Sequence, residues 1–400
     1  MANKIIGGAL LVAGTCIGAG MLGLPVSTAA AGFYYSAAGF GLCWSLMTLT
    51  AFFMLEVTLW YDQEVNLITM ARNHLGRGGA LAVWITYVLF LYTLMAAYTS
   101  GGAAIMAFLL QDMGISVLLS TIIFVLLFAT VVYKGTGWVD SLNRLMVAAL
   151  ILVYFLLLGL TLPQVQAAQI NTGHPQYLWV AVPIMVTSFG YHLLIPSLKT
   201  YLNGNLKHLR LSLYLGSLIP LLVYLLWEYI ILGILPIHGD PGLVQMLHHG
   251  QPVVTLTNSL QTMVGSAKIG LLAKLFSFFA IITSFIGVAL GLFDFFADGF
   301  NIERNPRGKL VLVALTFLPP AIFAATYPQG FIFALSYAGI FAALLLIIYP
   351  ALMVLRGRAQ QLNAPFQVPG GKSLAWLAVM AGIMVIVLQL LTPLNWLPSP

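Results

Sequence analysis

The chain has 400 residues, of which 61% are hydrophobic and 6% are charged, and its formal net charge is +6. Soluble globular domains carry about 25% charged residues, so sixteen basic and ten acidic side chains are too few to cover a water-facing surface. This composition excludes a soluble domain, a disordered chain and a disulfide-stapled secreted scaffold, and it indicates an integral membrane protein.

Long uncharged runs predict an all-α integral membrane protein with 11 transmembrane helices. A spanning helix needs roughly 20 apolar residues, whereas the strands of a membrane barrel have about 10 residues and alternate in polarity. Residues 5–55 carry no charge and no histidine and are divided by a Gly-Phe-Tyr-Tyr break after Ala31, which predicts the first two helices. The same reasoning predicts further spans at residues 80–110, 113–133, 145–163, 177–198, 211–235, 270–297, 310–327, 331–355 and 373–391.

The distribution of lysine and arginine predicts how these helices are oriented. With the N-terminus in the cytoplasm, fourteen of the sixteen basic residues lie on the cytoplasmic side, and only Lys268 and Lys274 lie outside. Short cytoplasmic loops retain basic residues, so we expect a cytoplasmic N-terminus and, after an odd number of spans, a periplasmic C-terminus. The positive net charge then reflects topology and contact with anionic lipid, and no nucleic acid is expected as a partner.

Two spans contain glycine and proline where a transmembrane helix should be continuous. The first reads Gly14-Thr-Cys-Ile-Gly-Ala-Gly-Met-Leu-Gly-Leu-Pro25, and the sixth reads Thr187-Ser-Phe-Gly-Tyr-His192 shortly before Pro196. Unwound backbone at that depth is tolerated where it lines a cavity, and interrupted helices at corresponding positions of two halves indicate the central site of a transporter. We expect one transporter domain over residues 1–400, with inverted five-helix repeats at 5–163 and 177–355 and an extra helix at 373–391. The alternative is that the glycines only allow close helix packing.

Broken helices 1 and 6 offer binding groups without any charged side chain. Backbone N–H groups after a break suit a carboxylate, and the carbonyls before it suit an ammonium group, so a zwitterionic α-amino acid is the expected ligand. Its side chain needs an aromatic-lined pocket, although each aromatic residue alone is as compatible with simple packing. The candidate substrate-binding residues are Thr15, Ile17, Gly18, Ala19, Gly20, Met21, Tyr98, Ser188, Phe189, Gly190, Tyr191 and Tyr337.

These strings also resemble a known family. The first-helix string, the string from Thr187 to His192 and the string Thr283-Ser-Phe-Ile-Gly-Val-Ala-Leu-Gly-Leu-Phe-Asp294 are similar to those of the bacterial tyrosine and tryptophan permeases. These permeases form the hydroxy and aromatic amino acid permease family of the amino acid–polyamine–organocation superfamily, and the resemblance covers about residues 4–391.

The resemblance implies a symporter of the bacterial inner membrane that takes up aromatic amino acids together with protons. It implies tyrosine as the preferred substrate, with tryptophan and phenylalanine as alternatives that the residues do not rank. It also implies eleven spans, the five-plus-five inverted repeat shared with sodium-coupled amine transporters, and no cofactor.

Three ionisable residues are candidates for carrying the coupling proton. His192 is the one histidine within a span, and its imidazole either titrates near neutrality or stays neutral and stabilises the break. Glu56 lies near the cytoplasmic end of the second span, where it either accepts a proton or reaches water. Glu228 lies within the seventh span, where a carboxylate is costly unless it is paired or protonated, but the family tolerates an amide there. Alternatively, Thr283 and Ser284 provide hydroxyls to a sodium ion.

Other readings of the chain have weaker support. Gly18 to Gly23 match G-x-G-x-x-G, but they lie inside a span and lack the acidic residue that a dinucleotide site needs about twenty positions later. The external histidines are too irregularly spaced for a metal site, and too few ionisable groups lie at depth for an intramembrane enzyme. A channel predicts continuous pore helices, whereas two helices are expected to be broken here.

Asp294 and Asp298 are expected to pair with Arg304 or Arg307, as a structural contact or as a gate.

Overall fold

The computed structural model describes residues 2–170, 173–239, 242–248, 251–362, 364–394 and 396. Within these ranges the chain forms helices and turns and contains no strand. Ten helices are long and apolar enough to cross a membrane, and a bent pair, Lys4–Cys16 with Gly20–Ala31, raises the number to eleven. The expectation of an all-α membrane protein with about eleven spans is therefore confirmed.

The first half of the chain runs from α1 to α6. The first expected span consists of α1 (Ala2–Cys16) and α2 (Gly20–Thr28), which are inclined to each other at 56°. A short 3-10 turn, η1 (Ala29–Ala31), leads into the second span. The next helices are α3 (Phe33–Thr58), α4 (Leu67–Leu109), α5 (Val117–Lys134) and α6 (Thr136–Thr161).

The sixth expected span is a succession of short helices. It comprises η4 (Pro175–Ala181), α8 (Val182–Ser188), η5 (His192–Leu194) and α9 (Ile195–Tyr201). The chain then continues through α10 (Leu206–Ile234), α13 (Ala267–Gly299), α14 (Pro306–Thr326), α15 (Phe331–Ala342), α16 (Tyr349–Ala359) and α17 (Gly371–Leu391). A π-helical segment, Ala343–Ile348, joins α15 to α16, and the connections include the short helices α7 (Ala167–Ile170), α11 (Leu243–His248) and α12 (Pro252–Val264).

Several helices extend beyond the apolar runs that predicted them. α4 begins at Leu67, where the side chain of Asn66 accepts a hydrogen bond from the N–H of Thr69, although the run was expected to begin at residue 80. The charged residues in its first turns ended the predicted run but not the helix. At Gly76 the backbone has φ +77°, so the helix axis changes direction before it enters the apolar stretch. Hydropathy marks the membrane-spanning part of a helix, whereas capping residues mark its ends.

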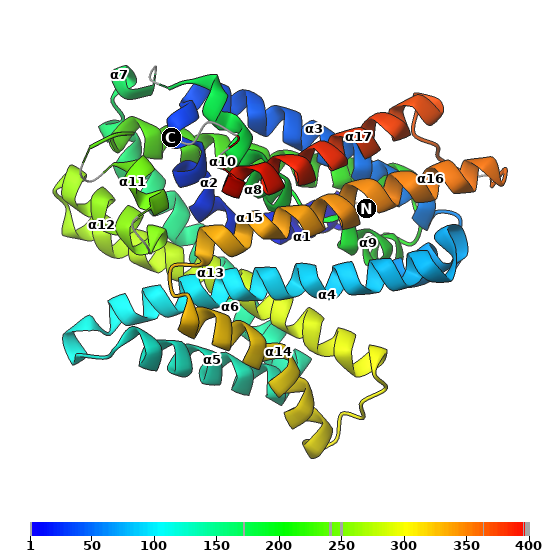
Figure 1. The fold of residues 1–400 in the computed structure, drawn as a ribbon, viewed down its shortest axis with the longest axis horizontal. Coiled ribbons are helices and arrows are strands. Elements are labelled where there is room, and N and C mark those ends of the chain that lie inside the picture. The colour runs from blue at the N-terminus through cyan, green and yellow to red at the C-terminus, as the bar shows by residue number, and fades with distance from the viewer. Residues whose placement is uncertain are drawn as a thin grey trace.

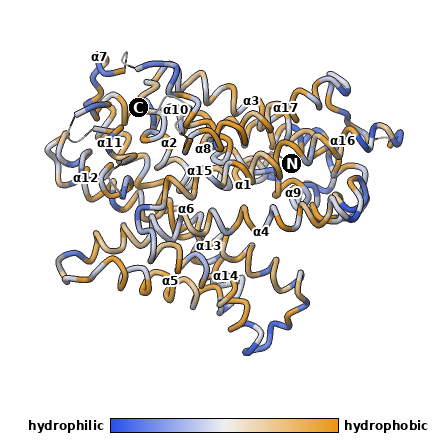
Figure 2. Tube along the Cα trace, viewed as in Figure 1, coloured by the Kyte–Doolittle hydropathy of each residue, from blue (hydrophilic) through white to orange (hydrophobic). Residues whose placement is uncertain are grey.

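The outer surface of the bundle is apolar along the helices and polar at their ends. In Figure 2 hydrophobic residues cover the length of the helices, and hydrophilic residues gather at the two ends of the molecule. Large side chains such as Leu126, Leu152 and Leu377 are 61%, 61% and 64% exposed. An apolar band between two polar ends is the surface that a lipid bilayer requires.

The half-helix α2 lies inside this bundle. All nine of its residues are buried, and it packs against α8, α10 and α11 (Figure 1). α1 packs along α10, and α13 packs along both α4 and α6. The point where α1 gives way to α2 is therefore surrounded by protein on the sides formed by α8, α10 and α13.

Candidate functional site

Helical structure stops at two places that face each other inside the bundle. One lies between Cys16, the last residue of α1, and Gly20, the first of α2. The other lies between Ser188, the last residue of α8, and η5. A Cβ atom added to Gly20 would lie 2.7 Å from Ser188 Oγ, so the two segments are in direct contact there. The glycine-rich strings of the first and sixth spans thus meet, and glycine at position 20 allows the close approach.

The hydroxyl of Tyr224, on α10, joins these two segments. Its oxygen lies 2.6 Å from the carbonyl oxygen of Cys16 and 3.0 Å from that of Ser188. The ring is 1% exposed and packs against Phe189, with ring centres 5.2 Å apart. A phenol has a single O–H proton, so it satisfies one of the two carbonyls fully at a time. Sequence reasoning missed Tyr224, because a tyrosine in an apolar helix is usually a packing residue.

Ser284, on α13, holds the start of α2 from another side. Its Oγ accepts a hydrogen bond from the N–H of Ala19 at 3.0 Å and donates to the carbonyl of Ala280 at 3.2 Å. A Cβ atom on Gly18 would overlap Ser284 Oγ, so this approach also requires glycine. The Thr283 hydroxyl donates to the carbonyl of Phe279 at 2.9 Å. Both hydroxyls of the alternative sodium site therefore donate their protons to carbonyls of their own helix, and a cation would meet the lone pairs of their oxygens.

A cavity of about 860 Å³ begins at the two breaks and runs toward the N-terminal end of α1. Its inner end, at Cys16, Gly20, Ser188 and Gly190, has no charged side chain in the described part of the chain. Its outer end includes Leu10 and Leu11 of α1 and the pair Asp140 and Arg144 of α6. Because the Asp140 and Arg144 side chains are 54% and 79% exposed, this end reaches the surface of the protein.

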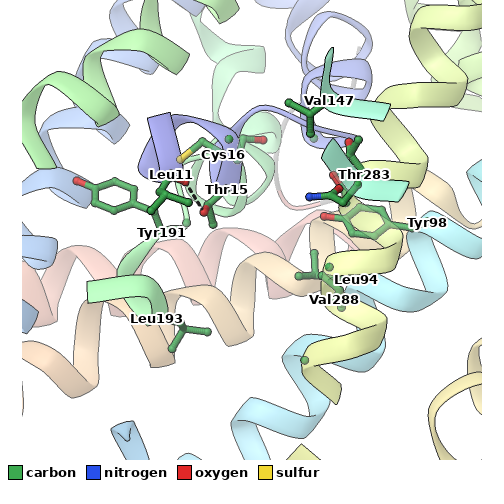
Figure 3. Close-up of a pocket in the computed structure, with 18 of the residues that line it drawn as sticks. Leu11, Thr15, Cys16, Leu94, Tyr98, Val147, Tyr191, Leu193, Thr283 and Val288 are labelled. Carbon is green, nitrogen blue, oxygen red and sulfur yellow. Dashed lines mark hydrogen bonds between the residues drawn. The ribbon is translucent and has the colours of Figure 1, made fainter. Parts of the chain in front are cut away.

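Figure 3 shows how the walls of the cavity are arranged. Thr15 and Cys16 of α1, with Tyr191 from the second break, lie on one side, and Tyr98, Thr283 and Val147 of α4, α13 and α6 lie on the other. The hydroxyl of Tyr98 points toward the space between the walls, whereas the ring of Tyr191 points away from Tyr98. Tyr98 is thus the aromatic side chain best placed to meet a ligand.

The predicted substrate-binding residues divide into two groups. Those that line the cavity are Thr15, Gly20, Tyr98, Ser188, Gly190 and Tyr191, together with the cation candidates Thr283 and Ser284. Those that do not line it are Ile17, Gly18, Ala19, Met21, Phe189 and Tyr337. Phe189 packs on Tyr224, and Tyr337 packs on Phe333 with ring centres 4.6 Å apart.

The three candidate proton carriers lie outside the cavity lining. His192 is 1% exposed, and its Nε2 is 2.9 Å from the hydroxyl of Thr50 on α3. Glu228 of α10 is fully buried, and one carboxylate oxygen accepts a hydrogen bond from the hydroxyl of Thr28, at the end of α2. The other oxygen, Oε2, has no hydrogen-bond partner. Glu228 thus connects α10 to the half-helix α2.

Glu56 does not reach water, so that alternative is wrong. The residue is 0% exposed, and the guanidinium of Arg358 donates two hydrogen bonds to its carboxylate, each 2.7 Å long. The N–H of Val368 donates a third, of 2.8 Å. Arg358 also donates to the carbonyls of Val368 and Gly371, so the segment between α16 and α17 covers the pair. A bidentate ion pair of this kind joins α3 to α16.

At the same end of the molecule, polar contacts attach α9 to the loop after α3. Glu64 accepts hydrogen bonds from Thr200 at 2.6 Å and from Ser197 at 2.8 Å, and these bonds hold the pKa of its carboxyl below the usual range. The ammonium group of Lys199 donates to the carbonyls of Tyr61 and Thr58. The second half of the sixth span is therefore fixed to α3 at its polar end.

The two aspartates at the end of α13 pair with Arg304, as expected. Asp294 lies 2.9 Å from the guanidinium and Asp298 lies 3.7 Å from it. No charged residue of this cluster lines the cavity, which supports the structural interpretation. Within the described residues, no group of three histidine, cysteine or acidic side chains is placed to hold a metal ion.

Comparisons with known proteins support the resemblance noted from the sequence. A family model described as the tryptophan/tyrosine permease family matches residues 1–389. The chain is 33% identical to tyrosine-specific transport system 2 of Haemophilus influenzae, over 99% of the chain and 98% of that protein. It is 34% identical to tyrosine-specific transport system 1 of the same organism, over 99% of both. It is also 34% identical to the tryptophan-specific transport protein of Pseudomonas aeruginosa, over 99% of the chain and 96% of that protein.

Replacing Tyr224 by phenylalanine removes the hydroxyl shared by the two breaks and keeps the ring. We expect Y224F to lose about 1–3 kcal/mol of stability, because buried carbonyls are left without a donor. Thermal unfolding of the purified protein in detergent, followed by circular dichroism, measures this loss. Tyr214 is on the same helix but is 46% exposed, so Y214F should unfold at the wild-type temperature. Equal midpoints for Y224F and wild type would contradict the bridging role.

Removing Arg358 leaves the Glu56 carboxylate buried without its partner. We expect R358Q to lose about 3–5 kcal/mol, and the double variant E56Q/R358Q to lose less than R358Q alone. A double-mutant cycle of unfolding midpoints in detergent measures the coupling between the two side chains. Additive losses would show that the ion pair does not join α3 to α16.

Proposed function

The chain belongs to the tryptophan/tyrosine permease family, and we propose that it is a secondary active transporter that imports aromatic amino acids by proton symport. Tyrosine is the proposed preferred substrate, and the proposed location is the bacterial inner membrane. Its similar proteins are named as transport proteins, which supports a carrier rather than an enzyme. The observation that carries the proposal is the cavity whose inner end is formed by two non-helical segments in contact and contains no charged side chain.

The inner end of the cavity suits a zwitterionic amino acid. The positive end of the α2 dipole begins at Gly20, where a carboxylate is stabilised. The carbonyls of Cys16 and Ser188 share one donor, Tyr224, so an ammonium group can supply the donors they lack. Tyr98 points into the space between the walls, where an aromatic ring can stack or its hydroxyl can bond. Uncharged polar groups thus match both ends of the substrate.

The open end of the cavity supports alternating access, for which we propose the two inverted repeats at 5–163 and 177–355. Leu10 and Leu11 belong to α1, the first half of the first span. The lysine and arginine distribution assigns the N-terminal end of this span to the cytoplasmic side. On that assignment the present conformation is open to the cytoplasm. Opening to the other side requires the fully buried α2 to separate from α8 and α11. Substrate would then bind from outside and leave along α1.

Glu228 is the proposed proton carrier of this chain, and family members with an amide at this position would need another group for the proton. It is fully buried, one of its oxygens has no partner, and the other binds Thr28 on the half-helix that must move. A buried carboxylate with incomplete pairing is costly when charged, so protonation and the position of α2 are linked. His192 is bonded to Thr50 away from the cavity, which supports its alternative role of stabilising the break. Glu56 is committed to Arg358.

Two alternatives remain part of the test. The tryptophan-specific transport protein of Pseudomonas aeruginosa and tyrosine-specific transport system 1 of Haemophilus influenzae are both 34% identical to this chain. A preference for tryptophan is therefore the first alternative. Sodium coupling through Thr283 and Ser284 is the second alternative, in which the Ala19 N–H would have to share Ser284 Oγ with the ion.

Uptake competition tests the proposal directly. Proteoliposomes containing the protein should accumulate labelled tyrosine under an inward proton gradient and not under a sodium gradient. Unlabelled tyrosine should compete better than tryptophan or phenylalanine. Stronger competition by tryptophan would replace the proposed preference, sodium-driven accumulation would replace the proposed coupling, and passive leakage without counterflow would overturn the carrier.

Replacing Glu228 by glutamine tests the proton carrier. Glutamine keeps the hydrogen bond from Thr28 but has no titratable proton, so we expect E228Q to exchange tyrosine across the membrane without accumulating it under a pH gradient. The matched control is E303Q, since Glu303 is exposed and outside the spanning helices. Accumulation by E228Q at the wild-type level would assign the proton to another group.

A further inference from the structure

The charged residues that line the cavity are confined to its outer end. Asp140 and Arg144 of α6 are the charged members of the lining in the part of the chain that the structure describes. Val147, also on α6, lines the cavity on the same side as Thr283 in Figure 3. Asp140 is seven residues from Val147, which corresponds to about 10 Å along the helix. The cavity therefore has an uncharged inner end and a charged outer end on the same helix face.

Asp140 and Arg144 form a pair that can exchange partners. Arg144 Nε lies 3.0 Å from Asp140 Oδ1, and Arg144 Nη2 lies 2.8 Å from Asp140 Oδ2. Both side chains are more than half exposed, at 79% and 54%, and an exposed pair of this kind contributes about 0–1 kcal/mol. Because the pair is weak and hydrated, a ligand carrying both charges can join it at little cost.

An aromatic side chain accompanies this pair in the cavity lining. Tyr87 of α4 lines the same cavity, and it is held in place by stacking on Phe295 with ring centres 4.7 Å apart and an angle of 23°.

The cavity is large enough for more than one small ligand. Its volume of about 860 Å³ lies near the upper end of the range of about 300–1,000 Å³ that holds drug-sized ligands, which are larger than a single aromatic amino acid. A ligand at the inner end would therefore leave the outer end free.

We propose that Asp140, Arg144 and Tyr87 form a second binding site, for a zwitterionic aromatic α-amino acid, at the outer end of the cavity. The ammonium group binds the Asp140 carboxylate, the carboxylate binds the Arg144 guanidinium, and the ring packs on Tyr87. The inference rests on the proposed transport function and extends it, because the substrate passes this site between the central site and the surface.

Binding stoichiometry tests the second site. Equilibrium dialysis of purified full-length protein in lipid nanodiscs against labelled tyrosine should give two molecules per chain for wild type and one for D140N/R144Q. The affinity of the remaining site should change by less than about twofold, because neither substitution removes a group that lines the inner end of the cavity. The charge-swapped variant D140R/R144D should again bind two, since a zwitterion can bind in the reversed direction. R304Q alters an ion pair outside the cavity and should bind two.

The outcomes separate this inference from the proposed function. One molecule per chain for wild type, or two for D140N/R144Q, would overturn the second site while leaving the transporter intact. No binding of any aromatic amino acid by wild type would overturn both. If D140N/R144Q fails to fold, Y87L provides the same test, because loss of the ring contact should weaken one of two sites by more than tenfold without abolishing the other.

Discussion

The structure depends on one constraint: main-chain groups released where a helix stops inside an apolar bundle must find partners in the protein. Two such stops lie in contact here, and two side chains from different helices satisfy them. Tyr224 of α10 serves the carbonyls of Cys16 and Ser188, and Ser284 of α13 serves the N–H of Ala19. Because these partners are neutral, the space beside them stays polar without a fixed charge, and this is the environment that the proposed zwitterionic substrate requires.

Two buried carboxylates in apolar surroundings differ in how completely they are hydrogen-bonded. Glu56 receives three hydrogen bonds, two from Arg358 and one from Val368, and it joins segments that are distant in the chain. Glu228 has a neutral hydroxyl as its hydrogen-bond partner, and one oxygen is left without any. A fully paired carboxylate holds helices together, whereas an incompletely paired one is sensitive to its own protonation. The fold thus separates a fully paired carboxylate from an incompletely paired one, which is the proposed proton carrier.

Much of the fold could be predicted from the sequence, and only part of the site. Uncharged runs located the spanning helices, because hydropathy is a local property, but they could not show the helical turns of α4 before Gly76, which Asn66 caps outside the apolar run. The glycine strings located the segments that meet, because backbone contact requires glycine. They could not tell that Gly20 and Ser188 line the cavity while Met21 and Phe189 do not, since the helical period is interrupted beside each pair. Tyr224 and Arg358 escaped notice because their partners lie far away in the chain.

The π-helical segment Ala343–Ile348 links the central cavity to the ion pair of Glu56. Leu346 lines the cavity, and it is the side chain nearest to a Cβ atom built on Gly190, at 3.0 Å. A π turn accommodates one more residue than an α turn. If this segment became α-helical without losing a residue, everything after it would rotate by about 100°, and Arg358 would then face lipid or a different helix instead of Glu56. The orientation of α16 is therefore set by a helical irregularity beside the cavity. A change in the turn of this segment acts on the cavity and on the Glu56–Arg358 ion pair at once.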